Sequence, residues 1–382
     1  MLGMSSGLAP RWRMTDSFGL MRSSDAIRGT LIGRGVSAEP YSLQGRKPAA
    51  LAVGTAQHAR LERPRSDLTD EQKMTNLILH HYDFSNYSEK VRVAMGFKSL
   101  RWKSVVVPPV APKPKLTPLT GGYRRAPVLQ IGADVYCDTR IILKELERRH
   151  PDPTLFPAGY GGLSNAVSAW AEGPLFRAIM LYAWGTNHDL MPPALFEDRA
   201  RMRGLPIPSV ASVERAAARN APLVRMQLAL VEDMLSDGRK WICGNQLTTA
   251  DLSVFHALWF MIDRSTRLAY EFDGLPAVRD WLARIRAFGH GTCEELSSDQ
   301  ALDFARTSEP KAVSRSGFRH PEDPDLGALV EVRASDYAKD AIVGRLEFLD
   351  MDEIVVRIRN DEVGEVAVHF PRIGFELRAA RN

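Results

Sequence analysis

The hydrophobic periodicity of this chain changes twice along its length, and these changes restrict the folds that it can adopt. Between residues 77 and 149, short apolar runs typical of buried strands alternate with helical patterns. From residue 163 to residue 309 we find only helical spacing, with apolar residues three and four positions apart. Beyond residue 328 the period becomes two, which is typical of strands with one buried face. We therefore expect an α/β domain, an all-helical domain and a small antiparallel β module, in that order.

The first region contains two strand patterns, a hairpin and two helix patterns. In chain order these are a strand at Leu77–His81, a helix from Tyr87 or Ser88 to Gly96, a strand at Ser104–Val107, a hairpin over residues 128–137 and a helix ending at Arg149. Gly96 is expected to cap the first helix, since glycine is the usual residue at a helix C-terminus. The pair Asp138-Thr139 is expected to cap the start of the second helix by accepting from its free N–H groups.

Helix and strand signals are also clear in the second and third regions. Thr248 lies three residues before Asp251, the spacing at which each side chain bonds a backbone N–H at the start of a helix. In the third region we expect five short antiparallel strands, which would form a small barrel or sheet. These are Leu329–Ala334, Ile342–Leu349 and the alternating runs near residues 354–359, 365–370 and 373–378.

Stretches rich in proline, glycine and serine separate these regions and set the expected domain boundaries. We predict a disordered segment at residues 1–73, an α/β domain at 74–150, a helical domain at 151–309, a linker at 310–327 and a β module at 328–382.

Residues 1–73 lack useful periodicity and are rich in Gly, Ser, Ala, Pro and Arg, so too little apolar surface is available to offset chain entropy. Three origins are open: an Arg-rich organellar transit peptide, a regulatory tail, or an upstream start that is not used, because Met74 opens directly into the first strand. This segment holds 11 basic and 7 acidic residues, whereas the chain from Met74 onward holds 39 of each. The net charge therefore does not indicate a nucleic-acid partner.

Several classes of protein lack support in the sequence. Cys137, Cys243 and Cys293 lie far apart with no CxxC pair, which suits a reducing compartment such as the cytoplasm and argues against structural zinc. Cys137 ends a strand, where a buried apolar role is favoured over a redox role. The longest apolar run, Leu252–Ile262, is too short to span a bilayer, so no membrane association is expected. We find no dinucleotide-binding, P-loop, zinc-protease or serine-hydrolase motif and predict no metal site.

Four short motifs occur in an informative order. They are Ser85-Asn86-Tyr87-Ser88-Glu89-Lys90-Val91-Arg92, Ala126-Pro127-Val128-Leu129, Asp138-Thr139, and Gly244 followed by Thr248-Thr249-Ala250-Asp251. Over residues 76 to about 290, this arrangement resembles the glutathione transferase family, which joins a thioredoxin-like domain to a helical domain. The motifs look like the family's Ser/Cys-Pro-aromatic-Ser-x-Lys-Val-Arg stretch, its Val-Pro-x-Leu with a cis proline, its Glu-Ser pair and its C-terminal capping motif. Asn86 stands where the family usually has proline.

The resemblance implies a role for Ser85 in stabilising the glutathione thiolate. A free thiol has a pKa of about 8.5, and only its thiolate attacks well. Each unit by which that pKa is lowered requires about 1.4 kcal/mol of preferential stabilisation of the anion. A hydroxyl at a helix N-terminus contributes to this through a hydrogen bond and the helix dipole. The alternative is that Ser85 only caps the helix, and Tyr82 and Tyr87 are other nearby donors.

The same resemblance implies how the rest of glutathione is held. A cis peptide at Ala126-Pro127 would leave the backbone groups of Ala126 free to pair with the cysteine backbone of glutathione; the alternative is an ordinary trans proline at the start of a strand. Asp138 would take the ammonium of the γ-glutamyl end, and Thr139 with its backbone N–H would take the carboxylate. Arg124 and Arg125 would reach the glycyl carboxylate, or form only a solvated edge.

The resemblance therefore predicts an enzyme that uses glutathione as a co-substrate against a small hydrophobic electrophile. Conjugation, ether cleavage, dehalogenation and isomerisation all remain open. Met180, Tyr182 and Trp184, near Phe176, either line the electrophile pocket or belong to the core. A homodimer is implied as well. The alternative is a non-catalytic interaction protein of the same fold that binds a partner through residues 328–382.

Overall fold

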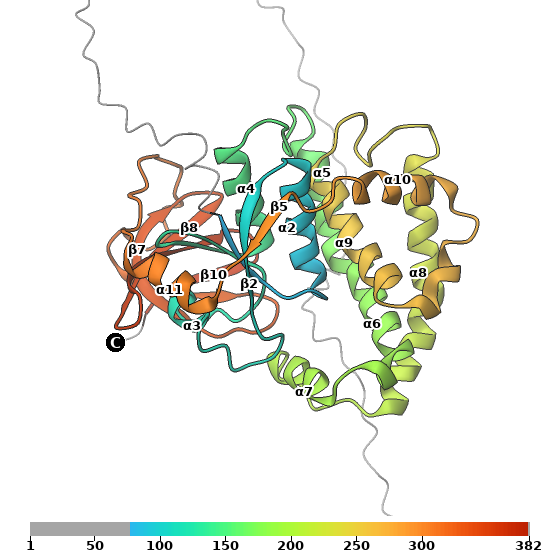
Figure 1. Cartoon of the computed structure of the whole chain (residues 1–382), viewed down its shortest axis with the longest axis horizontal. Coiled ribbons are helices and arrows are strands. Elements are labelled where there is room, and N and C mark those ends of the chain that lie inside the picture. The colour runs from blue at the N-terminus through green and yellow to red at the C-terminus, as the bar shows by residue number, and fades with distance from the viewer. Residues whose placement is uncertain (1–76, 381–382) are drawn as a thin grey trace, which may run out of the picture. The chain divides into compact units, whose positions relative to one another are not determined.

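The computed structural model describes residues 77–380, and the predicted disordered segment at residues 1–73 lies outside the described residues (Figure 1). The first region has the expected thioredoxin-like order of elements. These are β1 (Ile78–His81), α2 (Asn86–Phe97), β2 (Arg101–Val106), α3 (Thr117–Thr120), β3 (Val128–Ile131), β4 (Asp134–Cys137) and α4 (Thr139–Arg149). Strand β1 pairs in parallel with β2 and antiparallel with β3, which in turn pairs antiparallel with β4.

The interpretation of Gly96 as a helix cap is wrong. Helix α2 begins at Asn86, continues through Gly96 to Phe97 and is capped by Lys98. A Cβ atom on Gly96 would lie 2.1 Å from the carbonyl oxygen of Gly289. Glycine is therefore required at this position because a second segment of backbone passes against the helix, and not because the helix ends there.

The helical region follows and packs against α2. Its helices are α5 (Gly161–Trp170), α6 (Phe176–Thr186), α7 (Pro193–Met202), α8 (Val210–Leu235), α9 (Thr249–Asp263), α10 (Pro276–Arg286) and α11 (Ser298–Arg306), with a π-helical turn η1 (Ala171–Leu175) and short 3₁₀ turns η2 (His188–Leu190) and η3 (Thr266–Phe272). Figure 1 shows α5, α6, α8, α9 and α10 to the right of α2, with α7 below it. The capping box predicted at Thr248 and Asp251 is confirmed at the start of α9. One apolar core joins both regions, with Val91 of α2 and Phe255 of α9 among its fully buried residues.

The prediction that residues 163–309 contain only helices is wrong at one place. Strand β5 (Thr292–Glu295) adds to the sheet in parallel beside β2, with Arg101 opposite Thr292. All four of its residues are exposed, so no apolar pattern marks it in the sequence. Its position is set by long-range backbone contacts: a Cβ on Gly291 would lie 2.3 Å from the carbonyl oxygen of Leu100.

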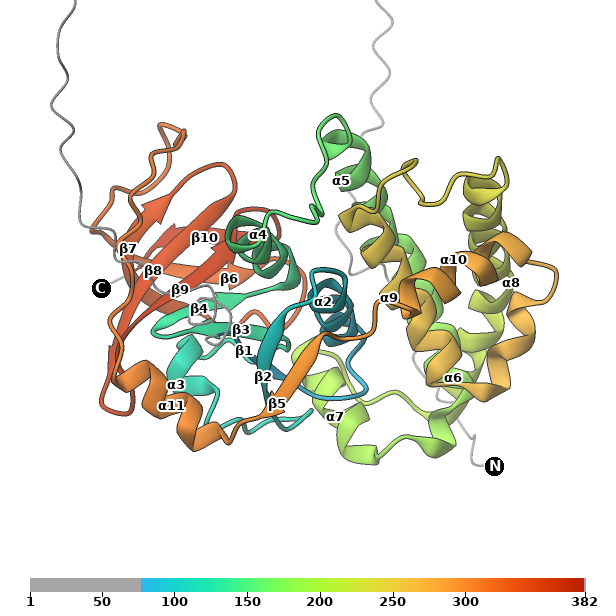
Figure 2. The same cartoon turned by 45° about the horizontal axis from the view of Figure 1, so that its top comes forward.

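The C-terminal strands extend the same sheet. They are β6 (Leu329–Ala334), β7 (Ile342–Leu349), β8 (Glu353–Asn360), β9 (Gly364–Pro371) and β10 (Phe375–Ala379). Strand β9 pairs in parallel with β4, so the ten strands form one sheet in the order β10-β6-β7-β8-β9-β4-β3-β1-β2-β5 (Figure 2). Of the two forms expected for this module, the structure has a sheet.

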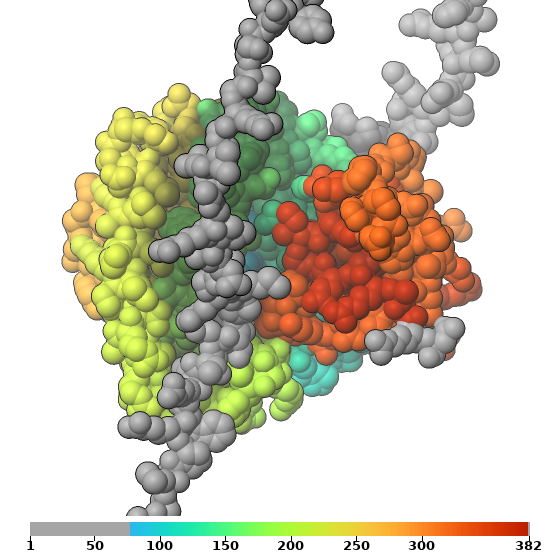
Figure 3. Space-filling model, turned by 180° about the vertical axis from the view of Figure 1, so that it is seen from behind, coloured from blue at the N-terminus to red at the C-terminus, as the bar shows by residue number. Residues whose placement is uncertain are grey.

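The added strands also share an apolar core with the thioredoxin-like region. Val128 and Val135 pack in this core together with Val332, Ile354 and Phe370. Cys137 is fully buried there, as expected for a small apolar side chain. Seen from behind, the C-terminal strands (orange to red) border yellow-green atoms of the helical region (Figure 3). Within residues 77–380, we find no helix both apolar and long enough to span a bilayer, and no group of three or more side chains placed to bind a metal ion.

Candidate active site

Strand directions bring the predicted site residues to one edge of the sheet. Strand β1 ends just before Ser85, and β3 runs antiparallel to it, with Val128 opposite His80. The residue pair Ala126-Pro127 therefore lies beside the end of β1. Strand β4 is antiparallel to β3, so its last residue leads directly into Asp138 at the same edge. The turn at Ser85 and the two ends of the β3–β4 hairpin therefore meet here.

Ser85 caps helix α2, and its hydroxyl also hydrogen-bonds with the side chain of Tyr82. The residue is 4% exposed, and its Oγ accepts a hydrogen bond of 3.1 Å from the backbone N–H of Ser88. A hydroxyl that accepts one bond can still donate its O–H. Because the free N–H groups of the first turn lie beside it, this position favours an anion. Capping and thiolate stabilisation are therefore compatible at Ser85.

Asn86 has a structural role that explains why it can replace the usual proline. Its Nδ2 donates a 2.8 Å hydrogen bond to Nδ1 of His256, which joins α2 to α9. Burial, reinforced by Lys90, lowers the pKa of His256 to about 3, so the imidazole is neutral. Its Nε2 therefore carries the proton, and this buried nitrogen has no hydrogen-bond partner among residues 77–380.

The backbone of Ala126 is available to a ligand. The Ala126-Pro127 peptide bond is cis, as the resemblance implies. Within residues 77–380, neither the N–H nor the C=O of Ala126 bonds to other backbone. A peptide could therefore pair with Ala126 as an added strand does.

Asp138 has an unusual backbone conformation at the start of α4. Its φ is +92°, in a region that side chains other than glycine rarely adopt, and such residues often occur at functional sites. Its Oδ1 accepts a hydrogen bond of 2.9 Å from the N–H of Arg140, and burial raises its pKa. Thr139 is 5% exposed, and its Oγ1 lies 3.5 Å from Nζ of Lys90. Asp138 thus takes the predicted capping position, whereas Thr139 is the first residue of α4 and its hydroxyl faces Lys90.

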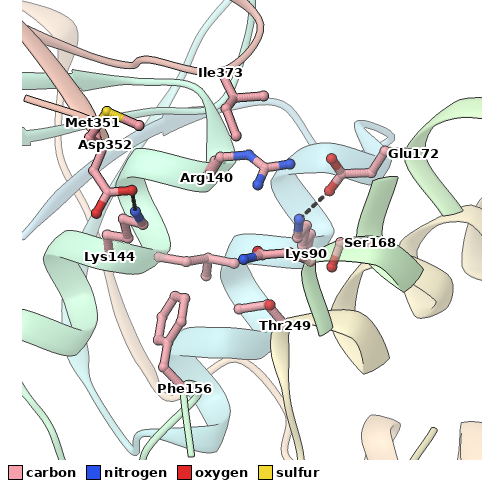
Figure 4. Close-up of a pocket in the computed structure, with 12 residues that line it drawn as sticks. Lys90, Arg140, Lys144, Phe156, Ser168, Glu172, Thr249, Met351, Asp352 and Ile373 are labelled. Carbon is pink, nitrogen blue, oxygen red and sulfur yellow. Dashed lines mark hydrogen bonds and ion pairs between the residues drawn. The ribbon is translucent and has the colours of Figure 1, made fainter. Parts of the chain in front are cut away.

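A small cavity of about 70 Å³ lies beside this helix start (Figure 4). On one side, Lys90 forms an ion pair with Glu172 of η1. Burial alone would raise the pKa of Glu172, but Lys90 outweighs this effect and the pKa falls to about 2. On the other side, Asp352 of the β7–β8 turn pairs with Lys144 of α4 at 2.6 Å. Turns between the C-terminal strands therefore line part of this cavity.

A loop between β6 and β7, residues 335–341, reaches the candidate site. The sequence does not predict that this loop lies there. Arg125 bonds to the carboxylate of Asp336 and to the backbone oxygen of Tyr337, and its guanidinium lies 3.9 Å from the centre of the Tyr337 ring. The N–H of Ala338 donates to the carbonyl of Met202 at 2.8 Å. No local pattern predicts these contacts, because they depend on the pairing of β9 with β4.

The remaining predicted side chains are engaged elsewhere. Arg124 pairs with Asp198, as Arg125 does with Asp336, so neither arginine is an unpaired solvated edge. The hydroxyl of Tyr182 bonds to Tyr270 and Glu271 in the helical region, and Trp184 packs edge-on against Phe196. Met180 Sδ lies 3.8 Å from Nη2 of Arg203 at the end of α7, and Phe176 packs edge-on against Tyr87 of α2, with 5.4 Å between ring centres. Burial, and then the nearby Tyr337, raise the pKa of Tyr87 well above its usual value.

Comparisons with known proteins agree with the fold described above. The family model for the glutathione S-transferase N-terminal domain matches residues 79–154, and that for the C-terminal domain matches residues 213–284. A search of curated protein sequences found no match. The solved structure of a GST-like protein from Pseudomonas syringae is 34% identical, with a TM-score of 0.66, and the match covers 80% of this chain and 100% of that one.

More distant structures match over part of the chain. A glutathione S-transferase from Rhodospirillum rubrum is 21% identical over 55% of this chain and 88% of its own, with a TM-score of 0.43. FzlA from C. crescentus is 22% identical over 56% of this chain and 88% of its own, with a TM-score of 0.42. On the identity and coverage of the Pseudomonas protein, together with the two domain matches, this chain belongs to the glutathione S-transferase family.

Proposed function

We propose that this protein is an enzyme that binds glutathione and uses its thiolate against a small, largely apolar electrophile. The observation that carries the proposal is the meeting of Ser85, Ala126 and the Asp138-Thr139 cap at one edge of the sheet. Bound glutathione would supply the nucleophilic sulfur. The protein's part is to hold the peptide and to favour the anion.

Each site residue has a distinct task in this proposal. The free backbone groups of Ala126 pair with the cysteine backbone of glutathione. The Asp138 carboxylate binds an ammonium, while the Thr139 hydroxyl and the N-terminus of α4 bind a carboxylate. Ser85 donates its O–H to the sulfur anion. Lowering the thiol pKa by two units would require about 2.7 kcal/mol, which a charge-assisted hydrogen bond can supply.

Calorimetry with the full chain tests glutathione binding. We expect binding by the wild-type protein and its loss in Asp138→Ala, because the carboxylate that holds the ammonium is removed. Ser297→Ala is the matched control, since Ser297 caps the surface helix α11 in the same way without belonging to the site. Absence of binding at millimolar glutathione in the wild-type protein would refute the proposal.

A second measurement separates thiolate stabilisation from binding. The ultraviolet absorbance of bound thiolate, followed against pH, reports the thiol pKa directly. In Ser85→Ala we expect glutathione to remain bound with a raised thiol pKa. An unchanged thiol pKa would leave Ser85 as a helix cap only and would transfer the role to another donor, such as Tyr82.

Two further expectations belong to this proposal. We propose a homodimer, which sedimentation analysis would test. We also propose a cytoplasmic location, because the three cysteines are free and glutathione is kept reduced there; cell fractionation would test it. The interaction-protein alternative predicts no glutathione binding, so the calorimetry above also discriminates against it.

A further inference from the structure

One tyrosine of the C-terminal region lies between two segments that border the candidate site. Tyr337 belongs to the loop between β6 and β7. On one side, its backbone oxygen accepts a hydrogen bond from Arg125, the residue next to Ala126. On the other side, the N–H of Ala338 donates to the carbonyl of Met202, the last residue of α7. The loop therefore spans from the residue before Ala126-Pro127 to the end of α7.

The ring of Tyr337 is held in place by its surroundings. The guanidinium carbons of Arg125 and Arg203 lie 3.9 Å and 5.1 Å from the centre of the ring. Such contacts between a cation and an aromatic face are attractive. The next residue, Ala338, has a φ of +48°, a conformation that costs energy for residues other than glycine and is often found at functional sites. Both the side chain and the backbone of this loop are thus fixed by the fold.

The hydroxyl of Tyr337, in contrast, is left without a protein partner. The residue is partly exposed, and within residues 77–380 its hydroxyl forms no hydrogen bond. The hydroxyl of Tyr82 accepts from Arg199, and that of Tyr182 donates to Glu271. A tyrosine hydroxyl can donate one hydrogen bond, so the donor of Tyr337 is available to a ligand.

Two tyrosines beside Ser85 show that Tyr337 lies near the position proposed for the sulfur. Tyr82 belongs to the same turn as Ser85, because its carbonyl accepts the Ser85 N–H at 3.1 Å. Burial raises the pKa of Tyr87 well above its usual value, and the nearby Tyr337 adds to this effect. Burial also raises the pKa of Tyr82, while Arg199 lowers it and Tyr337 raises it further. Since charges more than about 10 Å apart are largely screened, Tyr337 is close to both tyrosines.

We propose that the Tyr337 hydroxyl binds the electrophile and donates a hydrogen bond to an oxygen that becomes negative as the sulfur attacks. This inference rests on the proposed function and names its substrate class, which is electrophiles whose reacting carbon is conjugated to a carbonyl group. In these compounds the negative charge of the sulfur passes to the carbonyl oxygen. A donor that is already fixed beside that oxygen stabilises the charge without reorganisation. Tyr337 would thereby give the C-terminal strands a part in catalysis.

Two electrophiles with the same phenyl ring test the inference. In trans-4-phenyl-3-buten-2-one, a C–S bond forms at the carbon that carries the ring, the C=C electrons move to the carbonyl oxygen, and the neighbouring carbon then takes a proton from water. In benzyl chloride, a C–S bond forms at the CH₂ carbon, the C–Cl bond breaks and chloride leaves with the bonding electrons, so no oxygen gains charge. In both reactions the thiol proton goes to solvent. The measured quantity is the ratio of kcat/KM for the enone to that for benzyl chloride.

In Tyr337→Phe we expect this ratio to fall at least about tenfold, as for the loss of a hydrogen bond to a charged group. The phenylalanine ring keeps its contacts with Arg125 and Arg203, so a purely structural defect should lower both rates alike. Tyr160→Phe is the matched control and should leave the ratio unchanged. Tyr160 lies at the start of α5, and its hydroxyl also forms no hydrogen bond within the described part of the chain.

The other outcomes separate this inference from the proposed function. An equal loss of both rates in Tyr337→Phe would assign the hydroxyl to the sulfur or to folding, and an unchanged ratio would show that it does not touch the electrophile. Either result overturns the inference, as does a wild-type protein that accelerates the reaction of benzyl chloride but not that of the enone. A wild-type protein that accelerates neither reaction would refute the proposed function and this inference with it.

Absorbance gives a second readout that needs no reaction. S-Methylglutathione has no thiol and would fill the glutathione site, while 4-(4-dimethylaminophenyl)-3-buten-2-one absorbs at longer wavelength when its carbonyl accepts a hydrogen bond. In the presence of both compounds, we expect a shift to longer wavelength with the wild-type protein and with Tyr160→Phe, and a smaller shift with Tyr337→Phe. Equal spectra with the wild-type protein and with Tyr337→Phe would contradict the role assigned to Tyr337.

Discussion

Substitution of Asp251 with alanine tests how the helical region is held together. This residue lies near the start of α9 and is fully buried. Its carboxylate accepts hydrogen bonds from the N–H groups of Ile242 (2.8 Å) and Thr248 (2.9 Å), from Oγ1 of Thr248 (3.2 Å) and from Nε1 of Trp281 (3.0 Å). One side chain thereby joins the preceding loop, the start of α9 and helix α10.

The size of the effect follows from the donors that alanine would leave without a partner. The N–H groups of Ile242 and Thr248 and the indole N–H of Trp281 belong to residues at most 3% exposed. Each unsatisfied buried donor costs about 1–3 kcal/mol, so the three together cost about 3–9 kcal/mol. The Thr248 hydroxyl is left out of this sum because it can rotate. Against a typical domain stability of about 5–15 kcal/mol, the loss is large.

Urea unfolding followed by circular dichroism would measure the change in free energy of unfolding. Asp263→Ala is the matched control, because Asp263 lies at the other end of α9, is exposed and forms one ion pair of 2.8 Å with Arg286. That pair should contribute less than about 1 kcal/mol. Asp251→Asn keeps one acceptor oxygen and should be less destabilising than Asp251→Ala. A difference below about 2 kcal/mol between Asp251→Ala and Asp263→Ala would refute the reasoning.

Two other predictions concern α2 and the cysteines. Asn86→Ala removes the donor to Nδ1 of His256 and should lower the free energy of unfolding by about 1–3 kcal/mol, measured in urea; a neutral result would mean that the imidazole finds another partner. Cys293 is exposed while Cys137 and Cys243 are buried, so a thiol reagent should modify one of the three cysteines before unfolding. Rapid modification of two would contradict the burial of Cys137 or of Cys243.

The sequence predicts those elements whose signal is local. Strands β6 and β7 lie at the predicted residues, Leu329–Ala334 and Ile342–Leu349, because apolar side chains alternate with polar ones and one face is buried. Strand β5 has no such pattern, since all of its side chains are exposed and its place depends on backbone contacts with Leu100. The prediction that Gly96 ends a helix is wrong because two different situations favour glycine. One is a helix end, and the other is the close approach of a second backbone segment, which is what the structure has.

The same distinction applies to the candidate site. Ser85 and Asp138 are predictable because a capping side chain and the start of a helix are neighbours in sequence. The position of Lys113 over the Tyr82 ring is not, because Lys113 lies in a Pro-rich loop without periodicity and meets Tyr82 only through the tertiary fold. The contact between Tyr337 and Arg125 cannot be predicted from the local sequence either, because it depends on the register of strands in the extended sheet.

The pairing of β9 with β4 also determines how the C-terminal strands can be studied. Removal of residues 320–382 would expose the edge of β4 and would open an apolar core that includes Val135 and Phe370. A loss of activity after such a deletion would therefore report unfolding as much as a missing partner surface. Arg125, the residue next to Ala126, contacts Asp336 and Tyr337 in the loop between β6 and β7. Because this link can be cut by single substitutions that leave the shared core intact, point variants of the β6–β7 loop separate a role at the active site from a role in folding.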